Sequence, residues 1–363
     1  MSQFKPALIE ALEASVYTDE DVYRREQDAI FARTWQYACH VEKLQKPGDF
    51  VVCDVAGESL IVIREDAQTI NAFYNVCAHR AARILDGEGC KKRFACPYHA
   101  WTYNTRGELV SAPNARNVGG FDTSNYRLRA CRVETQHGLV FFNLDDDAVS
   151  LAEQAPEMLA GIRRYAPELP LLRFVHRTEA MLNGNWKVAI ENFSECYHCE
   201  LLHPELTQGI VDPSTYRVHV HPYSQGHLSR AYQGKDQAYQ FEGEQTDEFV
   251  AWWLWPNFAF QSYPGGRAHV WRWTPLGVDR THVSVDWYMP STDLEPWEQE
   301  LIDHHATTTF AEDIPIIERV QQGLGSRGYQ PGPLMIDSEK SQYSEHAVAA
   351  IQQLWRDAMG EKT

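Results

Sequence analysis

The chain has 363 residues, enough for two domains, and its 44% hydrophobic and 23% charged residues predict packed cores rather than disorder. Its formal net charge of −17 argues against nucleic acid or an anionic membrane surface as a partner. Neither a signal-peptide pattern nor a membrane-length apolar run is visible, so we expect a cytoplasmic protein whose eight cysteines are reduced thiols.

The first 150 residues predict a helical arm followed by a small all-β domain. Residues 18–35 have the acidic start and apolar spacing of a capped amphipathic helix. Residues 50–55 and 59–64 are strand-like and flank Ala56-Gly57-Glu58, which indicates a hairpin. Further strand patterns follow at residues 70–76, 132–134 and 139–144. We therefore expect an arm over residues 1–36 and a β domain over residues 37–150.

The remaining residues, 151–363, predict a second domain that mixes helices and strands. Helical patterns cover residues 151–165, 297–323 and 344–359, and residues 186–202 have the pattern of one long helix. A strand is expected at residues 173–182, and an aromatic, β-rich section runs from residue 219 to 288. The fold class predicted for the whole chain is α+β.

Two Cys/His pairs lie in the β domain, each at the end of a strand pattern. Cys77-x-His79 and Cys96-x-x-His99 could hold zinc tetrahedrally, or a Rieske [2Fe–2S] cluster with two thiolates on one iron and two imidazoles on the other. Zinc pairs usually have at least two residues between their members. The short C-x-H pair, followed by C-P-x-H-x-W ending at Trp101, therefore favours the cluster.

A second candidate metal site lies in the predicted helix of residues 186–202. His198 and His203 are five residues apart, with Glu191 and Glu195 upstream. Two imidazoles and one distant carboxylate form the facial triad that holds Fe(II) with open positions for O₂. A spacing of five requires a widened helical turn if both imidazoles meet one ion. The alternative is a surface helix with incidental His and Cys residues.

With both motifs in view, the chain resembles the oxygenase component of the Rieske non-heme iron oxygenases. The second motif matches the family pattern E-N-x-x-[DE]-x-Y-H-x(4)-H. The resemblance implies an antiparallel catalytic sheet flanked by helices, and the chain departs from the usual pattern at Ala81, where Gly is common, and at Glu195, where Asp is common. It also implies a [2Fe–2S] cluster and a mononuclear Fe(II). The expected ligands of the cluster are Cys77, His79, Cys96 and His99. Those of the Fe(II) are His198, His203 and Asp313, and Glu312 is the alternative to Asp313.

The same resemblance assigns roles and partners. Glu195 and Asn192 are the expected catalytic residues, with Glu195 linking His198 to a Rieske histidine of a neighbouring subunit. That link implies a homotrimer. Electrons would come from a separate NAD(P)H-dependent flavin and iron–sulfur reductase, because the chain has no dinucleotide fingerprint.

Within the family, the segments Glu195-Cys196-Tyr197-His198-Cys199 and His203-Pro204 resemble those of the oxygenases of carnitine, glycine betaine and proline betaine. This similarity implies hydroxylation or N-demethylation of a quaternary ammonium substrate, and we expect Trp255, Phe258 and Phe260 to surround its cation. Cys196 and Cys199 are expected to be packing thiols in the helix. The alternatives are an oxygenase of an aromatic acid or ether, a non-catalytic Rieske electron carrier, and a zinc-stabilised binding protein.

Overall fold

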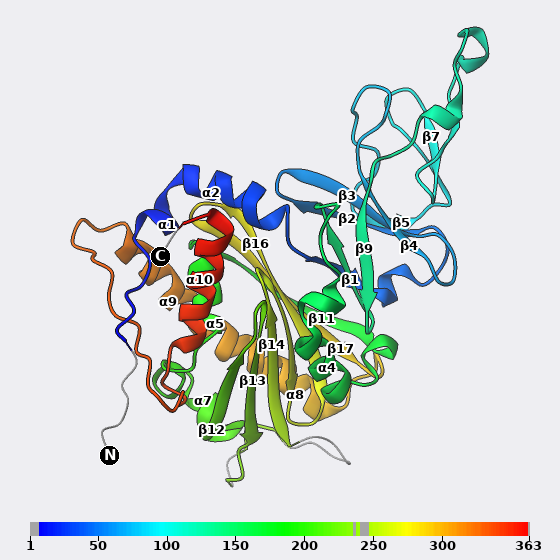
Figure 1. The fold of residues 1–363 in the computed structure, drawn as a ribbon. Helices are drawn as coiled ribbons and strands as arrows, with labels where there is room; N and C mark the ends of the chain where they lie inside the picture. The colour runs from blue at the N-terminus through cyan, green and yellow to red at the C-terminus, as the bar shows by residue number, and fades with distance from the viewer. Residues whose placement is uncertain (1–6, 235–236, 240–246, 362–363) are drawn as a thin grey trace. The chain divides into compact units, whose positions relative to one another are not determined.

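A computed structural model describes residues 7–234, 237–239 and 247–361, which form two compact units (Figure 1). The small unit is Phe31–Leu151, and the large unit joins Met1–Ile30 to Ala152–Thr363. The small unit begins and ends within a few residues of the all-β segment expected from the sequence. None of the helices in the described ranges has the length and apolar character needed to cross a membrane.

The small unit is built from two antiparallel sheets. The larger sheet has the order β1-β10-β9-β4-β3-β2-β5, and the smaller one has the order β6-β7-β8. The bounds of the larger sheet's strands are β1 Gln36–His40, β2 Asp49–Val55, β3 Glu58–Arg64, β4 Ile70–Tyr74, β5 Glu88–Cys90, β9 Ala130–Gln136 and β10 Leu139–Asn143. Those of the smaller sheet are β6 Arg93–Ala95, β7 Thr102–Asn104 and β8 Leu109–Ser111.

The hairpin expected near residue 57 is confirmed as β2 and β3. Its turn residues, Ala56 and Gly57, have φ angles of 51° and 75°, the left-handed backbone that a two-residue hairpin turn requires. Alternation along β3 sends Ile61 and Ile63 to one face of the sheet and Leu60 and Val62 to the other. The first of these faces forms a core with the small sheet.

The large unit is centred on a seven-stranded antiparallel sheet of order β11-β17-β16-β15-β14-β13-β12. These strands are β11 Arg173–Leu182, β12 Val211–Val220, β13 Ser224–Ala231, β14 Glu248–Leu254, β15 Phe258–Tyr263, β16 Arg267–Gly277 and β17 Arg280–Met289. The helices are α1 Ser15–Thr18, α2 Glu20–Glu26, α3 Leu151–Gln154, α4 Pro156–Tyr165, α5 Trp186–Phe193, α6 Cys199–Leu202, α7 Pro204–Gly209, α8 Pro296–Thr307, α9 Thr309–Leu324 and α10 His346–Met359.

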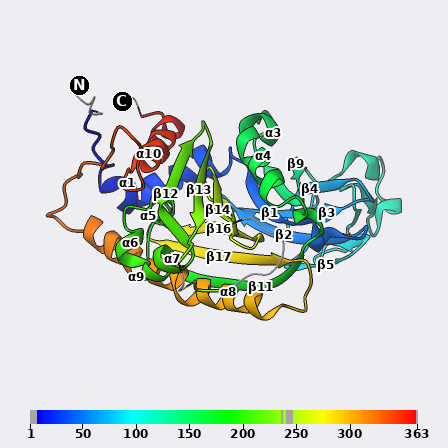
Figure 2. The same ribbon diagram turned by 90° about the horizontal axis from the view of Figure 1, so that it is seen from below.

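Helices cover both faces of this sheet (Figure 2). α4 packs on β13 and β14, and a Cβ added at Gly161 would lie 2.1 Å from Nε1 of Trp252. On the other face, α5 packs on β16 and α9, and α9 packs on β11. The predicted α+β class is therefore confirmed, and the antiparallel sheet flanked by helices matches the expectation from the family.

The N-terminal arm is tied into the large unit by a buried ion pair. Glu26 in α2 is 0% exposed and its Oε1 lies 2.5 Å from Nζ of Lys187 in α5. Trp186 Nε1 donates to the Glu26 carboxylate at 2.9 Å, and Trp355 Nε1 from α10 donates at 2.7 Å. One carboxylate therefore joins the beginning, middle and end of the chain.

The helical predictions for residues 18–35 and 297–323 were too continuous. The helix expected over residues 18–35 is α2, whose cap is the Asp19 side chain accepting from Asp21 N, followed by a π-helical turn at Gln27–Phe31. The helix expected over residues 297–323 is divided between α8 and α9 at Thr308, whose φ and ψ of −108° and −101° are not helical. Both differences arise from local backbone geometry that the apolar spacing does not encode.

Candidate metal centres and active site

The sequence around His198 does not form the single long helix that we expected. α5 begins at the Asn185 cap, which accepts from Lys187 N, and ends at Phe193. The carboxylate of Glu195 then accepts hydrogen bonds from the backbone N–H groups of Tyr197 and, at 3.3 Å, His198. A side chain that binds these donors replaces helical backbone bonds, and so it stops the helix.

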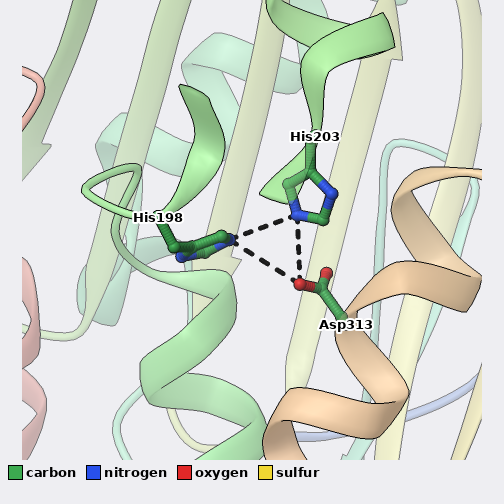
Figure 3. A group of neighbouring side chains, drawn as sticks. All are labelled: His198, His203 and Asp313. Carbon is green, nitrogen blue, oxygen red and sulfur yellow. Dashed lines mark hydrogen bonds and ion pairs between the residues drawn. The ribbon is translucent and has the colours of Figure 1, made fainter. Parts of the chain in front are cut away.

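Two histidines five residues apart can meet at one site because the backbone between them is not one continuous helix. His198 lies just before α6, and His203 lies between α6 and α7. The two Nε2 atoms are 3.2 Å apart, and Asp313 Oδ1 from α9 is 3.1 Å from His203 Nε2 and 3.6 Å from His198 Nε2 (Figure 3). No widened helical turn is needed, because His203, with φ and ψ of −118° and 62°, is itself outside the helical conformation.

These three side chains fit a single metal ion. Their ligand atoms all lie within 4.8 Å of one another, and theirs is the one group of this size among the described residues. Ligands at about 2.1 Å from an ion and at right angles to one another lie about 3 Å apart. Two nitrogens and one oxygen with these separations match the facial-triad donor set.

A second layer of side chains orients these donors. Glu195 contacts His198 Nδ1, and Glu312 Oε2 lies 2.8 Å from His203 Nδ1. Binding at Nδ1 fixes each ring so that the Nε2 lone pair points into the site. Asn192 Nδ2 donates to Asp313 Oδ1 at 3.2 Å. Of the two carboxylates considered from the sequence, Asp313 therefore lies in the triad and Glu312 lies behind a histidine.

The Cys/His pairs of the small unit form two loops of the same shape. Cys77 and Cys96 are both 3% exposed and neither is in a disulfide. The residue four positions later, Ala81 or Ala100, donates to each cysteine carbonyl at 3.0 Å and has a φ near +58°. Glycine adopts this backbone without strain, which explains why it is common at the position of Ala81.

The histidines of the two loops lie together near the surface. The ring centroids of His79 and His99 are 4.7 Å apart, and His79 stacks on Trp101 at 4.7 Å. Two buried thiols with two more accessible imidazoles fit a [2Fe–2S] cluster whose histidine-bound iron lies toward solvent. The four residues do not form a single-ion group among the described residues, which is unlike a zinc site.

A small aromatic cavity of about 30 Å³ adjoins the triad. α5 contributes residues 189, 192 and 193, and α9 contributes residues 310, 313, 314 and 317. These spacings of three, four and seven place each set on one helical face. The opposite wall is the sheet, and the aromatic side chains in the lining are Phe193, Trp271, Trp273 and Phe310.

Two of the three expected cation-binding residues lie on the sheet face opposite this cavity. Phe260 pairs with Trp252, which contacts Gly161 of α4, so these two side chains share the face that α4 covers. Trp271 pairs with Ala259, the residue before Phe260, so Trp271 lies on the opposite face. Phe258 and Phe260 therefore point to the face that α4 covers. Trp255 follows β14, and its ring centroid lies 5.9 Å from that of Trp186. It is not among the residues that line the cavity.

Two of the four aromatic residues that line the cavity, Phe193 and Phe310, were identifiable from one signal. Phe193 directly follows Asn192 in the motif, and Phe310 lies three residues before Asp313. Positions next to a ligand on the same helical face are the natural candidates for a substrate wall. The sheet residues Trp271 and Trp273 share a strand face, but the sequence does not say which face of the sheet this is.

A second cavity of about 230 Å³ adjoins the first, and Asn192 lines both. Its lining includes the carboxylates Glu191, Glu195 and Glu345. Burial raises the pKa of Glu191 to about 7, although Tyr17 O–H donates to its Oε1 at 2.8 Å. Burial also raises the pKa of Glu345. Glu191 is thus partly protonated near neutral pH.

One expectation about the cysteines was wrong. Cys196 and Cys199, which flank Tyr197 and His198 in the sequence, form a disulfide and are not free packing thiols. Both are buried, at 5% and 6% exposure. A helix from residue 186 to 202 would have kept them as helical neighbours, whereas the break after Phe193 places them on a turn.

Comparison with known proteins agrees with both centres. The family described as "Rieske [2Fe-2S] domain" matches residues 34–126, and the family described as "Ring hydroxylating alpha subunit (catalytic domain)" matches residues 169–361. The carnitine monooxygenase oxygenase subunit of Acinetobacter pittii (strain PHEA-2) is 33% identical over 93% of this chain and 92% of its own length. The glycine betaine monooxygenase oxygenase subunit of Chromohalobacter salexigens is 28% identical over 87% and 80%.

Solved structures extend this comparison to the whole fold. The quaternary ammonium Rieske monooxygenase CntA in complex with L-carnitine superposes with a TM-score of 0.87 and 31% identity, covering 97% of this chain and 96% of that one. Naphthalene 1,2-dioxygenase from Rhodococcus sp. has the same fold at 20% identity and a TM-score of 0.81. With a Rieske [2Fe–2S] domain and a mononuclear-iron catalytic domain, the chain belongs to the Rieske non-heme iron oxygenases as an oxygenase (alpha) subunit, an oxidoreductase.

Proposed function

We propose that this chain is the terminal oxygenase of a multicomponent monooxygenase that oxidises an N-methyl group of a quaternary ammonium compound. The observation that carries the proposal is the aromatic cavity beside the triad. Phe193 and Trp273 have ring centroids 5.0 Å apart in an edge-to-face arrangement, and Trp271 stacks on Trp273 at 5.3 Å. Aromatic faces attract a trimethylammonium group without a hydrogen bond, which such a cation cannot form.

The charges around the cavity support a cation as well. Its described lining contains Asp313 and no Lys or Arg, and the lining of the adjoining cavity contains three glutamates and no Lys or Arg. The relatives that have carnitine, choline and glycine betaine in their names agree with this chemistry. Phe193, Trp271, Trp273 and Phe310 replace the aromatic residues expected from the sequence.

The proposed ligands of the two centres are the residues expected from the sequence. Cys77, Cys96, His79 and His99 would hold the cluster, and the triad would hold the iron. When bound, the cluster supplies single electrons and the mononuclear iron activates O₂. Oxidation of one N-methyl group consumes O₂, two electrons and two protons, and yields water and an N-hydroxymethyl group. This group then releases formaldehyde, leaving the demethylated amine and a proton.

The chain's own residues orient the metal ligands and the substrate in this reaction, and they exclude water. Glu195 holds the His198 ring, and Asn192 holds Asp313 from the side of the second cavity. The aromatic walls place an N-methyl group next to the triad and exclude water from it.

We also propose partners and a location. The electrons would come from a separate NAD(P)H-dependent reductase, which implies the cytoplasm, where that nucleotide is available. Glu195 would link His198 to the cluster of a neighbouring subunit in a homotrimer. Insights into inter-subunit electron transfer came from the solved structure of a quaternary ammonium Rieske monooxygenase that is 30% identical to this chain. Glu195 has the contact with His198 that such a link requires.

The decisive experiment is single-turnover oxidation by the anaerobically reduced protein with a panel of quaternary amines and aromatic acids. We expect formaldehyde from at least one quaternary amine. The Trp273→Leu variant should bind that amine about 5- to 30-fold more weakly, because a desolvated cation–π contact contributes about 1–2 kcal/mol. Phe260→Leu, on the opposite sheet face, is the matched control. Product from an aromatic acid alone would overturn the proposal.

A further inference from the structure

The aromatic row on β16 ends in a polar group that the proposed reaction does not use. His269, Trp271 and Trp273 alternate along the strand and so share the face that lines the cavity. His305 from α8 covers the far end of this row. Its ring centroid is 4.8 Å from that of His269, 5.3 Å from Trp271 and 6.3 Å from Phe310. His305 therefore lies beside Trp271 and Phe310, which line the cavity, and His269 lies beside His305.

Several polar atoms at this end have no partner in the described part of the chain. They are both ring nitrogens of His305, Nδ1 of His269 and Nε1 of Trp287. The three residues are 1%, 0% and 0% exposed, and the Trp287 ring lies 4.1 Å from that of His269. Unpaired polar groups in a protein interior cost free energy, so a cluster of them indicates a guest that completes their hydrogen bonds.

The hydrogen bonds of Gln261 define what this guest must offer. Gln261 Oε1 accepts from Trp271 Nε1 at 2.7 Å and contacts His269 Nε2 at 2.5 Å. Because an indole N–H can only donate, the amide atom must be the oxygen, and His269 Nε2 must then carry its proton. Nδ1 of His269 is consequently a lone-pair acceptor. Trp287 Nε1 is a donor, and a neutral His305 offers one donor and one acceptor.

Burial keeps both imidazoles neutral. It lowers the pKa of His305 to about 3 and holds the pKa of His269 well below its usual value. The neighbouring groups do not reverse this. The ring of His305 faces the titratable groups His269 and Tyr263 and the aromatic rings of Trp271, Trp287 and Phe310, and the charged-state effects of His304 and His203 lower its pKa further.

The guest must therefore both donate and accept. A carboxylate cannot donate, and it would face the lone pair of His269. A trimethylammonium group can do neither. A hydroxyl group does both. We propose that His269, His305 and Trp287 form a hydroxyl-binding subsite at the end of the substrate cavity, which selects quaternary ammonium alcohols over their deoxy counterparts. This inference rests on the proposed function.

Matched pairs of substrates test the proposal, because their members differ by one hydroxyl. The first pair is L-carnitine and γ-butyrobetaine, and the second is choline and ethyltrimethylammonium. Equilibrium Kd by calorimetry and kcat/KM by formaldehyde release are measured on the iron-loaded protein. We expect the alcohol to be preferred about 10- to 100-fold in at least one pair. His305→Leu should bring that ratio close to one by weakening the alcohol alone.

Two further variants keep the result interpretable. Trp287→Phe retains the ring and removes the donor, so it should lower the ratio even if His305→Leu does not fold. His282→Leu, on β17 with its ring paired to Glu179 at 3.3 Å, is the control and should leave the ratio unchanged.

Each outcome decides the question. A wild-type ratio near one, or a ratio that survives both His305→Leu and Trp287→Phe, means that these atoms hold only ordered water, and the subsite is refuted while the proposed function stands. The absence of turnover and of binding with every quaternary amine overturns the proposed function itself, and the subsite with it.

Discussion

Replacing Glu26 by alanine should destabilise the large unit by at least about 3 kcal/mol. Breaking a buried ion pair by removing one partner costs about 3–5 kcal/mol, because the remaining charge stays in the interior. Lys187 is 1% exposed and has Glu26 at 2.5 Å, so its ammonium would lose its carboxylate partner without gaining water. Trp355 would also lose the acceptor of its indole N–H.

The assay is equilibrium unfolding in denaturant, with the variants in the same buffer and at the same iron loading. For a unit of this size, a loss of about 3–5 kcal/mol corresponds to a fall in Tm of roughly 6–20 °C. The double variant Glu26→Leu with Lys187→Met should lose less stability than Glu26→Ala alone, because no charge is then buried without a partner.

The pH dependence gives a second check on the same variant. Burial lowers the pKa of Lys187, and Glu26 opposes that shift. Without Glu26 the folded chain should release the proton that the unfolded chain holds, so the stability of Glu26→Ala should rise with pH toward 9. A loss below about 1 kcal/mol, or a double variant less stable than Glu26→Ala, would refute the reasoning.

Three other predictions concern the site and its supports. Glu195→Gln should leave the iron content and the cluster spectrum unchanged but slow multiple-turnover formaldehyde release at least about tenfold, because a carboxylate orients the imidazole better than an amide does; full activity would count against the proposed link. Glu191→Gln should remove a fall in stability of roughly 2–3 kcal/mol between pH 5 and 8, because a carboxyl whose pKa is raised to about 7 in the folded state favours folding while protonated; parallel pH profiles for the two proteins would argue otherwise. Gly161→Ala should cost about 1–3 kcal/mol by forcing Trp252 to move, whereas Gly323→Ala, with nothing within 4 Å, should be neutral or stabilising, as thermal unfolding of both would show.

The metal-binding motifs were readable from the sequence because their information is local. Cys77-x-His79 and Cys96-x-x-His99 each lie within one turn, so their spacing is also their geometry. The distant Asp313 came from the family resemblance, and the structure brings it within 3.1 Å of His203 Nε2.

The substrate wall was not readable in the same way. Alternation along a strand says that Phe258 and Phe260 share a face, but not which face meets the catalytic helices. That choice depends on strand order and on which helix covers each side, and both are set by contacts between distant segments. The break after Phe193 was also hidden, since a carboxylate that binds its own backbone leaves the apolar pattern unchanged.

The buried ion pair between Glu26 of α2 and Lys187 of α5 also sets an order of events during synthesis. Lys187 follows Glu26 by 161 residues, and Trp355 follows it by 329. At about 5–20 residues per second, the ribosome makes the first partner roughly ten to thirty seconds after α2, and the last up to about a minute after it. The whole small unit, Phe31–Leu151, is made during that wait. The first helices of the chain are thus among the last to reach their native environment, and the inserted domain has time to fold before the domain that contains it can close.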